Sequence, residues 1–132
     1  MTNDKSINEI DLDYVSITYQ DPIVYFVYKD NIELGFPEIR EVISFAEKLS
    51  GFRPYVTLSD ARVRINITNE GKRVLSDMRN MPLFRGTAVI VTNNMFKFAA
   101  NFLMAFNKPK YPFRAFTSKE EAVAWLLSLP LD

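Results

Sequence analysis

The side chains of this sequence that are best suited to chemistry stand in one loop, directly after a strand-like apolar run that ends at Leu58. The loop places the acid Asp60 close to two bases, Arg62 and Arg64. Because this cluster comes shortly before a predicted helix, whose N-terminal dipole attracts negative charge, it favours binding of an anion or a protein partner. The structural alternative is a self-satisfied turn in which Asp60 pairs with one of the arginines.

Thr68 and Asn69 extend this candidate surface to the start of the predicted helix. The Thr68 hydroxyl is suited to accept a hydrogen bond from a backbone N–H group, as N-cap side chains do. It could also accept a phosphate group, whose charge would alter docking onto a partner. We expect the capping role.

The usual catalytic and metal-binding side chains are missing. The chain has no Cys and no His, which excludes Ser-His-Asp and Cys-His pairs and the common zinc and haem sites. Its four glycines stand apart, so there is no glycine-rich phosphate loop. Glu120 and Glu121 are adjacent and point to different sides of a helix, while Glu9, Asp11 and Asp13 lack the further oxygen ligands of a hard-cation site. We therefore expect no enzyme, no cofactor and no metal site.

Composition indicates one globular domain. A chain of 132 residues with 48% hydrophobic and 24% charged residues is ordinary for a soluble protein. We expect a single domain over residues 1–132, with a flexible segment at 1–8. Residues 1–6 lack the apolar core of a signal peptide, and no run approaches the ~20 apolar residues of a membrane span. Since a chain without cysteine has no disulfides, we expect a cytoplasmic protein.

Charges are distributed unevenly although the net charge is zero. Residues 1–50 carry ten acids and four bases, whereas residues 51–118 carry three acids and eleven bases. Such asymmetry can mark a basic face for an anionic partner. We favour the alternative that folding brings acidic and basic side chains close together, and we expect no nucleic-acid partner.

The most apolar stretch is a predicted helix over residues 95–106, which is apolar on nearly every side and contains four of the eleven phenylalanines. For any single phenylalanine we expect a core position. One small sheet cannot cover every side of such a helix, so its surplus surface predicts contact with another helix, a second copy of the chain or a ligand. The candidate residues of this surface are Phe98, Phe102, Phe106 and the basic Lys108.

Hydrophobic periodicity predicts a β-β-α-β-α-β-α-β-α order. Alternation of apolar and polar residues predicts a first strand. The alternation changes phase between Tyr14 and Val15, which indicates a bulge or the start of a strand there. A dense apolar run then predicts the strand that pairs with it in a hairpin. Continuous apolar runs predict buried parallel strands. The fold class is therefore α/β, a mixed sheet with an N-terminal hairpin, mostly parallel strands and about four helices. The remaining predicted strands cover 54–58, 86–92 and 113–116, and the helices cover 37–49, 69–81, 94–106 and 118–129.

Residues 56–75 carry a recognisable pattern. A strand ends in Asp60, and eight residues later Thr68 and Asn69 precede Gly71 and a leucine on the predicted helix. This arrangement resembles the STAS superfamily, which includes anti-sigma-factor antagonists and the cytoplasmic tails of sulfate transporters. In that family the pair is Asp-Ser, and phosphorylation of the Ser breaks docking onto a kinase-type partner. Because Asn69 takes the place of that Ser, the resemblance implies the fold but not the phosphorylation switch.

The C-terminal third carries a closer resemblance. Residues 101–109, 112–116 and 120–126 read Asn-Phe-Leu-Met-Ala-Phe-Asn-Lys-Pro, Pro-Phe-Arg-Ala-Phe and Glu-Glu-Ala-Val-Ala-Trp-Leu. These segments are similar to the SpoIIAA-like branch of the superfamily, which contains many uncharacterised bacterial proteins. In element order the resemblance covers residues 14–129.

Together these features predict a bacterial, cytoplasmic, STAS-like regulatory module that acts by binding. The simplest partner is a second copy of the chain, in a homodimer, and an unidentified protein partner is also open. One alternative is a carrier that holds a small amphiphile or lipid between the helix at 95–106 and the sheet. The other is a phospho-regulated antagonist of a kinase-type partner, with its phosphate on Thr68 or a neighbouring residue. The sequence names neither the ligand nor the process.

Overall fold

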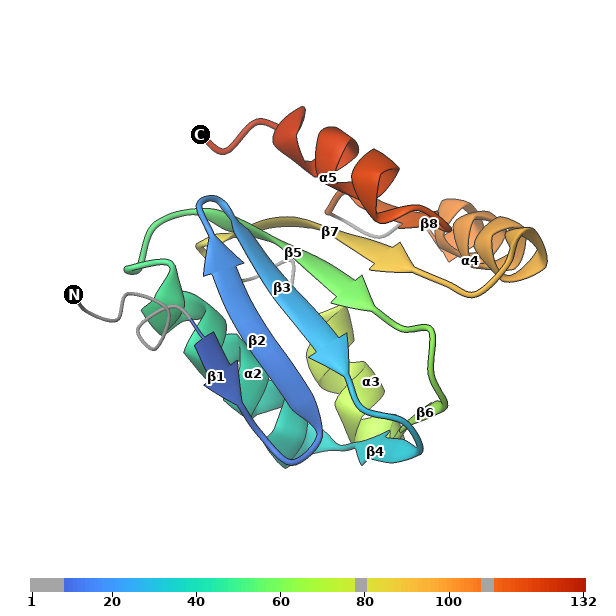
Figure 1. Ribbon diagram of the computed structural model, residues 1–132, viewed down its shortest axis with the longest axis horizontal. Helices are drawn as coiled ribbons and strands as arrows, with labels where there is room; N and C mark the ends of the chain where they lie inside the picture. Colours follow the sequence, from blue (N-terminus) through green and yellow to red (C-terminus); the bar gives the residue numbers. More distant parts are fainter. Residues whose placement is uncertain (1–8, 78–80, 108–110) are drawn as a thin grey trace.

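A six-stranded mixed sheet forms the centre of the protein in the computed structural model, which describes residues 9–77, 81–107 and 111–132 (Figure 1). For residues 103–107 it describes the backbone. The strands are β1 (Glu9–Asp11), β2 (Val15–Gln20), β3 (Ile23–Tyr28), β4 (Ile32–Leu34), β5 (Tyr55–Asp60), β6 (Ile65–Ile67), β7 (Phe84–Ile90) and β8 (Phe113–Phe116). The helices are α2 (Phe36–Leu49), α3 (Asn69–Ser76), α4 (Asn94–Asn107) and α5 (Lys119–Leu127).

The predicted fold class is confirmed. The sheet order is β1-β2-β3-β5-β7-β8; β2 and β3 form an antiparallel hairpin, and β3, β5, β7 and β8 run parallel. The predicted first strand is in fact two strands, since β1 ends at Asp11 and β2 begins at Val15. The prediction missed β4 and β6, which pair with each other beside the main sheet. Strands of three residues are too short to show a periodic pattern.

The helices cover the two faces of the sheet unequally (Figure 1). α2 and α3 lie on one face, where alternate residues of β2, such as Val15 and Ile17, are buried. α5 lies on the other face, against Leu58 of β5 and Ile90 of β7. α4 lies beside the edge strand β8, with which it makes its main contacts. Among the described helices, α2 and α3 are therefore the two that cover this face.

Helix α4 confirms the predicted element but not the predicted burial. Phe98 and Phe102 are 73% and 60% exposed, and Phe96 is exposed as well, so a core position is wrong for these three residues. The physical reason is that α4 packs on one side only. There the Asn101 amide accepts a hydrogen bond from the Ala115 N–H group at 2.8 Å and donates one to the Ala115 carbonyl at 3.2 Å.

Local sequence signals account for the helix ends that position the site. The Glu38 carboxylate accepts a hydrogen bond from the Gly35 N–H group at 2.8 Å, which fixes the start of α2. Gly51, with a φ of 68°, follows α2 in the left-handed conformation predicted for a helix end. Thr68 caps α3, where its hydroxyl accepts a hydrogen bond from the Gly71 N–H group at 3.0 Å.

Candidate functional site

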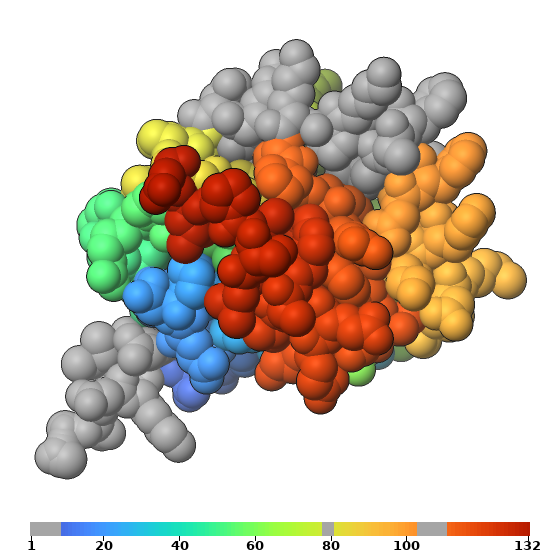
Figure 2. Space-filling model, turned by 90° about the horizontal axis from the view of Figure 1, so that it is seen from above, coloured from blue at the N-terminus to red at the C-terminus, as the bar shows by residue number. Residues whose placement is uncertain are grey.

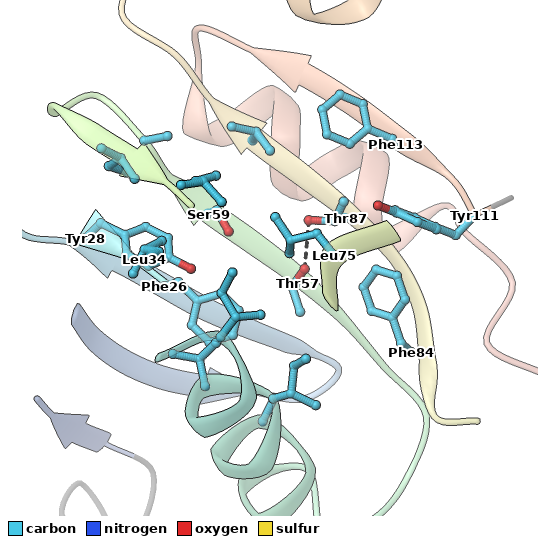
Figure 3. A pocket seen from close by; sticks show the side chains of 18 of the residues that line it. Phe26, Tyr28, Leu34, Thr57, Ser59, Leu75, Phe84, Thr87, Tyr111 and Phe113 are labelled. Atoms are coloured by element: carbon cyan, nitrogen blue, oxygen red, sulfur yellow. Dashed lines mark hydrogen bonds between the residues drawn. The ribbon is translucent and has the colours of Figure 1, made fainter. Parts of the chain in front are cut away.

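A cavity of about 310 Å³ lies between the sheet and helices α2 and α3 (Figure 3). Among the described residues nineteen line it, and none of them is charged. Its walls come from β3, β5 and β7, from the segment around β8, and from α2, β6 and α3. Pockets of this size and apolar character are typical of small-molecule sites.

The cavity exists because small polar residues replace bulky ones on the sheet face beneath it. Thr57 and Ser59 alternate along β5 toward this face, and Thr87 lies opposite Thr57 on β7. The neighbouring residues Val56 and Leu58 point to the α5 face, which is tightly filled. Because α4 stays at the sheet edge, no described residue of α4 lines the cavity.

Hydroxyl groups form a line along the floor of the cavity. The Thr57 hydroxyl donates a hydrogen bond to the Thr87 hydroxyl at 2.7 Å, joining two parallel strands through their side chains (Figure 3). Ser59 follows on β5, near Tyr28 of β3. Burial raises the pKa of the Tyr28 phenol to about 12, although a hydrogen bond with Ser59 partly offsets the rise. At neutral pH the Tyr28 phenol therefore keeps its proton.

Tyr55, on the same strand as Thr57, carries an unusual buried group. Its side chain is 1% exposed, and its hydroxyl has no hydrogen-bond partner among the described residues. Buried hydroxyl groups in native proteins nearly always have a partner. Burial, assisted by the Glu47 carboxylate, raises the pKa of Tyr55 well above the usual range, so the group is a protonated donor.

Aromatic rings close the end of the cavity near β8. Tyr111 meets Phe84 edge to face, with ring centroids 5.0 Å apart, and Phe84 in turn lies 6.2 Å from the Tyr55 ring. The Tyr111 side chain points toward the Thr57–Thr87 pair (Figure 3). Burial raises the pKa of Tyr111 too, so the phenols that line the cavity are neutral at physiological pH.

The charged side chains of the loop around Asp60 are paired within the protein, as the structural alternative predicts. Both carboxylate oxygens of Asp60 bind the Arg62 guanidinium, at 2.9 and 2.7 Å, and Arg62 holds the pKa of Asp60 below its usual range. Arg64 reaches across to Asp30, where its hydrogen bonds lower the pKa of that carboxylate to about 2. Both arginines thus have their charge paired.

A second, open hollow of about 620 Å³ brings this loop close to α4. Its lining includes Arg62, Arg64 and Phe96. The arginines in it are already bonded to carboxylates, so the hollow offers an anion little unpaired charge.

The helix-start residues are separate from the cavity. Thr68 uses its hydroxyl as the N-cap of α3, which confirms the expected capping role. Asn69 is the first residue of α3 and is exposed. Neither residue lines the cavity.

The predicted aromatic surface is present on α4 in part. Phe98 and Phe102 stack with ring centroids 6.4 Å apart and planes 17° apart. Figure 2 shows the first turns of α4, in yellow-orange, standing out from the molecule beside α5. Phe106 belongs to the part of α4 described by its backbone, and Lys108 lies outside the described residues.

The cavity was not predicted from the sequence. Thr57 and Thr87 lie on runs that the sequence predicts as buried strands, and Ser59 belongs to the predicted loop, although β5 extends to Asp60. The signal lies in the polar members of these segments. This space lies between the sheet and helices α2 and α3, whereas the carrier hypothesis placed its ligand between the helix at 95–106 and the sheet.

The described residues contain neither a metal-binding cluster nor a membrane-spanning helix. No group of three or more acidic side chains among them is arranged to hold a metal ion. None of their helices combines the length and apolar character needed to cross a bilayer.

The sheet order and the placement of the helices define a SpoIIAA-like fold. The structure is similar to the crystal structure of an uncharacterised protein of the DUF3478 family, with a SpoIIAA-like fold, from Shewanella loihica PV-4. The two match with a TM-score of 0.57 and 19% sequence identity, over 85% of this chain and 91% of that one. The fold expected from the resemblance is therefore confirmed.

The chain itself belongs to the family DUF7793, described as a domain of unknown function, whose profile matches residues 17–129. This range runs from β2 to just beyond α5 and so includes every residue that lines the cavity. No curated protein matches the chain.

Proposed function

We propose that this protein is a non-enzymatic binding module that holds a small, mostly apolar ligand in the cavity between the sheet and helices α2 and α3. The observation that carries the proposal is the 310 Å³ cavity with an uncharged, largely apolar wall and a few hydroxyl groups on its floor. That combination of apolar lining and sparse polar groups suits recognition of an amphiphile.

The same lining favours binding over catalysis. General acid–base chemistry needs groups whose pKa lies near the working pH. Burial raises the pKa of the three cavity tyrosines still further above neutral pH. They are Tyr28, Tyr55 and Tyr111. Thr57 and Thr87 bond to each other and have no adjacent base in the described lining.

A neutral naphthylamine dye, whose fluorescence rises in apolar surroundings, tests the proposal. We expect saturable enhancement with the unmodified protein and its loss when a large side chain fills the space, in Ala61→Phe at the rim or Ala46→Leu from α2. Ala99→Phe, on the exposed side of α4, is the matched control and should bind the dye normally. Circular dichroism establishes that each variant is folded.

Two results would count against the proposal. The first is dye enhancement that rises without saturation in the unmodified protein. The second is undiminished dye binding by both filled variants when they are folded, because the dye would then bind elsewhere.

Self-association is a second candidate function, and the exposed Phe98–Phe102 stack favours it. Single exposed apolar residues are ordinary, whereas neighbouring aromatic rings on one helix are typical of a contact surface. We propose a homodimer through α4, in a cytoplasmic setting, where a chain without cysteine needs no oxidising compartment.

Sedimentation velocity at micromolar concentration tests the homodimer. The unmodified chain should sediment as a dimer and Phe102→Glu as a monomer, because the introduced charge would be buried at the contact. Leu127→Glu, at an exposed apolar position of α5, is the control that should stay dimeric. A monomeric unmodified chain would remove this candidate and leave the cavity proposal untouched.

A further inference from the structure

We infer that the ligand of the cavity is an uncharged, mostly apolar molecule with a hydrogen-bond acceptor, such as a ketone or ester carbonyl, which the Tyr111 hydroxyl binds beside Thr87. The inference rests on the proposed ligand-binding function and names the chemical class of the ligand. It also gives the ligand a direction, with its acceptor at the β7–β8 end of the cavity and its apolar body toward α2.

Backbone pairing places Tyr111 close to Thr87. The Thr87 N–H group donates a hydrogen bond to the Pro112 carbonyl at 3.0 Å, and Thr87 lies opposite Phe113 in the register of β7 and β8. Side chains of an extended chain alternate between two faces, so Tyr111, two residues before Phe113, belongs on the face of Phe113 and Thr87. All three side chains do line the cavity. The pairing of β7 with β8 therefore sets the position of Tyr111 in the cavity.

The Tyr111 hydroxyl is an accessible donor without a partner. It points toward the Thr57–Thr87 pair (Figure 3), and no hydrogen bond joins it to a described residue. Tyr111 is half-buried and its hydroxyl keeps accessible surface, whereas the Tyr55 hydroxyl has almost none. Burial raises the pKa of Tyr111, so the group is a donor at neutral pH. The edge-to-face contact with Phe84 holds the ring in this orientation.

The Thr57–Thr87 pair supplies a second unused proton in the same part of the cavity. Each hydroxyl has one proton and two lone pairs, so the bond between them uses one of the two protons. Thr57 is the donor and is buried, so the unused proton belongs to Thr87, which is half-buried. Because a carbonyl oxygen has two lone pairs, it can accept hydrogen bonds from Tyr111 and Thr87 together.

The rest of the lining determines the charge and the direction of the ligand. None of the nineteen described lining residues carries a charge, so an ion would lose its hydration without gaining a counter-charge. The lining residues of α2 are all aliphatic; they are Ile39, Val42, Ile43 and Ala46. An apolar body toward α2 and an acceptor toward β7 and β8 therefore match the character of the two walls.

The volume sets the size of the apolar body. An engineered apolar cavity of roughly 150 Å³ holds benzene, so 310 Å³ has room for about two such rings. Acetophenone, an aromatic ketone of eight carbons, is therefore a suitable probe. It has relatives of similar size that carry a charge or lack an acceptor.

Isothermal calorimetry with three eight-carbon probes tests the inference on the full chain. Acetophenone is neutral and carries a carbonyl acceptor, phenylacetate is an anion, and ethylbenzene has no oxygen. At neutral pH we expect acetophenone to bind at least ~10-fold more tightly than phenylacetate, because the uncharged lining penalises the ion. This comparison uses the unmodified protein, so it does not depend on the folding of a variant.

Tyr111→Phe then isolates the hydroxyl. The change should weaken acetophenone by about 3- to 10-fold and leave ethylbenzene binding unchanged, since ethylbenzene has no oxygen to accept the hydrogen bond. Unchanged ethylbenzene binding also shows that the cavity of the variant is intact. Tyr25→Phe, which removes a hydroxyl on the α5 face, is the matched control and should bind acetophenone as tightly as the unmodified chain.

The outcomes separate the inference from the proposed function. An unchanged affinity of Tyr111→Phe for acetophenone, or equal weakening of acetophenone and ethylbenzene, would show that the hydroxyl does not bind the carbonyl. Phenylacetate binding as tightly as acetophenone would show that the ligand need not be neutral. Each of these results overturns the inference and leaves the cavity as a ligand site. If none of the three probes and no naphthylamine dye binds the unmodified protein, the proposed function itself falls.

Discussion

At the scale of single residues, the cavity is marked by polar groups where a core would have aliphatic ones. Thr57 and Thr87 face each other across two central parallel strands, and Tyr55 buries a hydroxyl without a described partner. A purely structural core gains nothing from such groups, because each polar atom taken from water needs compensation. Their presence on one face, while Val56 and Leu58 fill the other, is the strongest local evidence for a ligand site.

The Asp30–Arg64 pair makes stability depend on acid pH. In the folded protein the pKa of Asp30 is about 2, below the ordinary value of 3.8. A lowered pKa means that the pair stabilises the fold above about pH 4, and that this contribution is lost as the pH falls toward 2. We therefore expect Asp30→Asn to lower the urea midpoint at pH 7 and to match the unmodified chain near pH 2.

Urea midpoints measured between pH 7 and pH 2 check this expectation. Asp13→Asn, at another exposed acid, is the control for a general effect of removing one negative charge. A difference between Asp30→Asn and the unmodified chain that stays constant down to pH 2 would show that the Asp30 carboxylate is not stabilised by Arg64.

The residue types near Asp60 were identified correctly from the sequence, but their role was left open. Charge pairing depends on which side chains the fold brings together, and Asp30, which binds Arg64, is 34 positions away in the chain. Thr68 was predictable because capping is local, acting over three residues. The cavity was not predictable in this way, since it depends on where α4 lies relative to the sheet.

At the scale of elements, the Asn101 side chain attaches α4 to the outer edge of β8. β8 is the last strand of the sheet, so its outer backbone groups have no strand partner. Asn101 supplies both a donor and an acceptor to Ala115 and takes the place of a further strand. An edge covered in this way is protected against pairing with another chain. The helix is then held beside the sheet and does not cover the cavity face.

The strands and helices themselves were mostly predictable, because their signals are local. Pro37 lies in the first turn of α2, where proline loses no hydrogen bond, and Gly51 follows the helix in the left-handed conformation that glycine favours. Asparagine is a favoured N-cap residue, and the side-chain oxygen of Asn93 accepts a hydrogen bond from the Phe96 N–H group at 2.9 Å. The sequence did not predict β4 and β6, because each of these short strands is stabilised by pairing with the other. In the chain they are separated by α2 and β5.

Gly71 decides how closely α3 approaches the rest of the fold. A Cβ atom at this position would lie 2.8 Å from the Leu34 carbonyl oxygen and 2.9 Å from Cδ1 of Ile39. Alanine is intrinsically the better helix former by about 1 kcal/mol. We nevertheless expect Gly71→Ala to lower the free energy of unfolding by about 1–2 kcal/mol, because α3 must move away from β4 and α2.

Urea denaturation gives the free energies for this comparison. Lys72→Ala, at the next and exposed position of α3, should change stability by less than about 0.5 kcal/mol. If Gly71→Ala proves more stable than the unmodified chain, the close approach of α3 to Leu34 and Ile39 is wrong. Dye binding by the folded Gly71→Ala variant would also report whether the cavity wall formed by α3 has shifted.

At the scale of the whole molecule, the sheet separates a filled side from a hollow one. The α5 side packs Ala122 and Leu126 against the central strands with both residues 0% exposed. The other side buries Val15 and Ile17 of β2 and holds the cavity, whose wall includes residues of α2. The two sides should therefore differ in local stability and in their response to a ligand, which is measurable by hydrogen exchange.

We expect the central strands β3, β5 and β7 to exchange their amide protons most slowly, since each is paired on both edges and covered by side chains. α4 should exchange much faster, because its main contacts are with the edge strand β8 and it leaves Phe98 and Phe102 exposed. A saturating concentration of the naphthylamine dye should slow exchange in α2 and α3, which form the cavity wall, and leave α5 unchanged. Mass spectrometry of exchanged peptides resolves these segments, with the α5 peptide as the internal control. Equal slowing of α2, α3 and α5 would indicate general stabilisation of the fold without a site on one face, and α4 exchanging as slowly as β5 would contradict its loose attachment to the sheet edge.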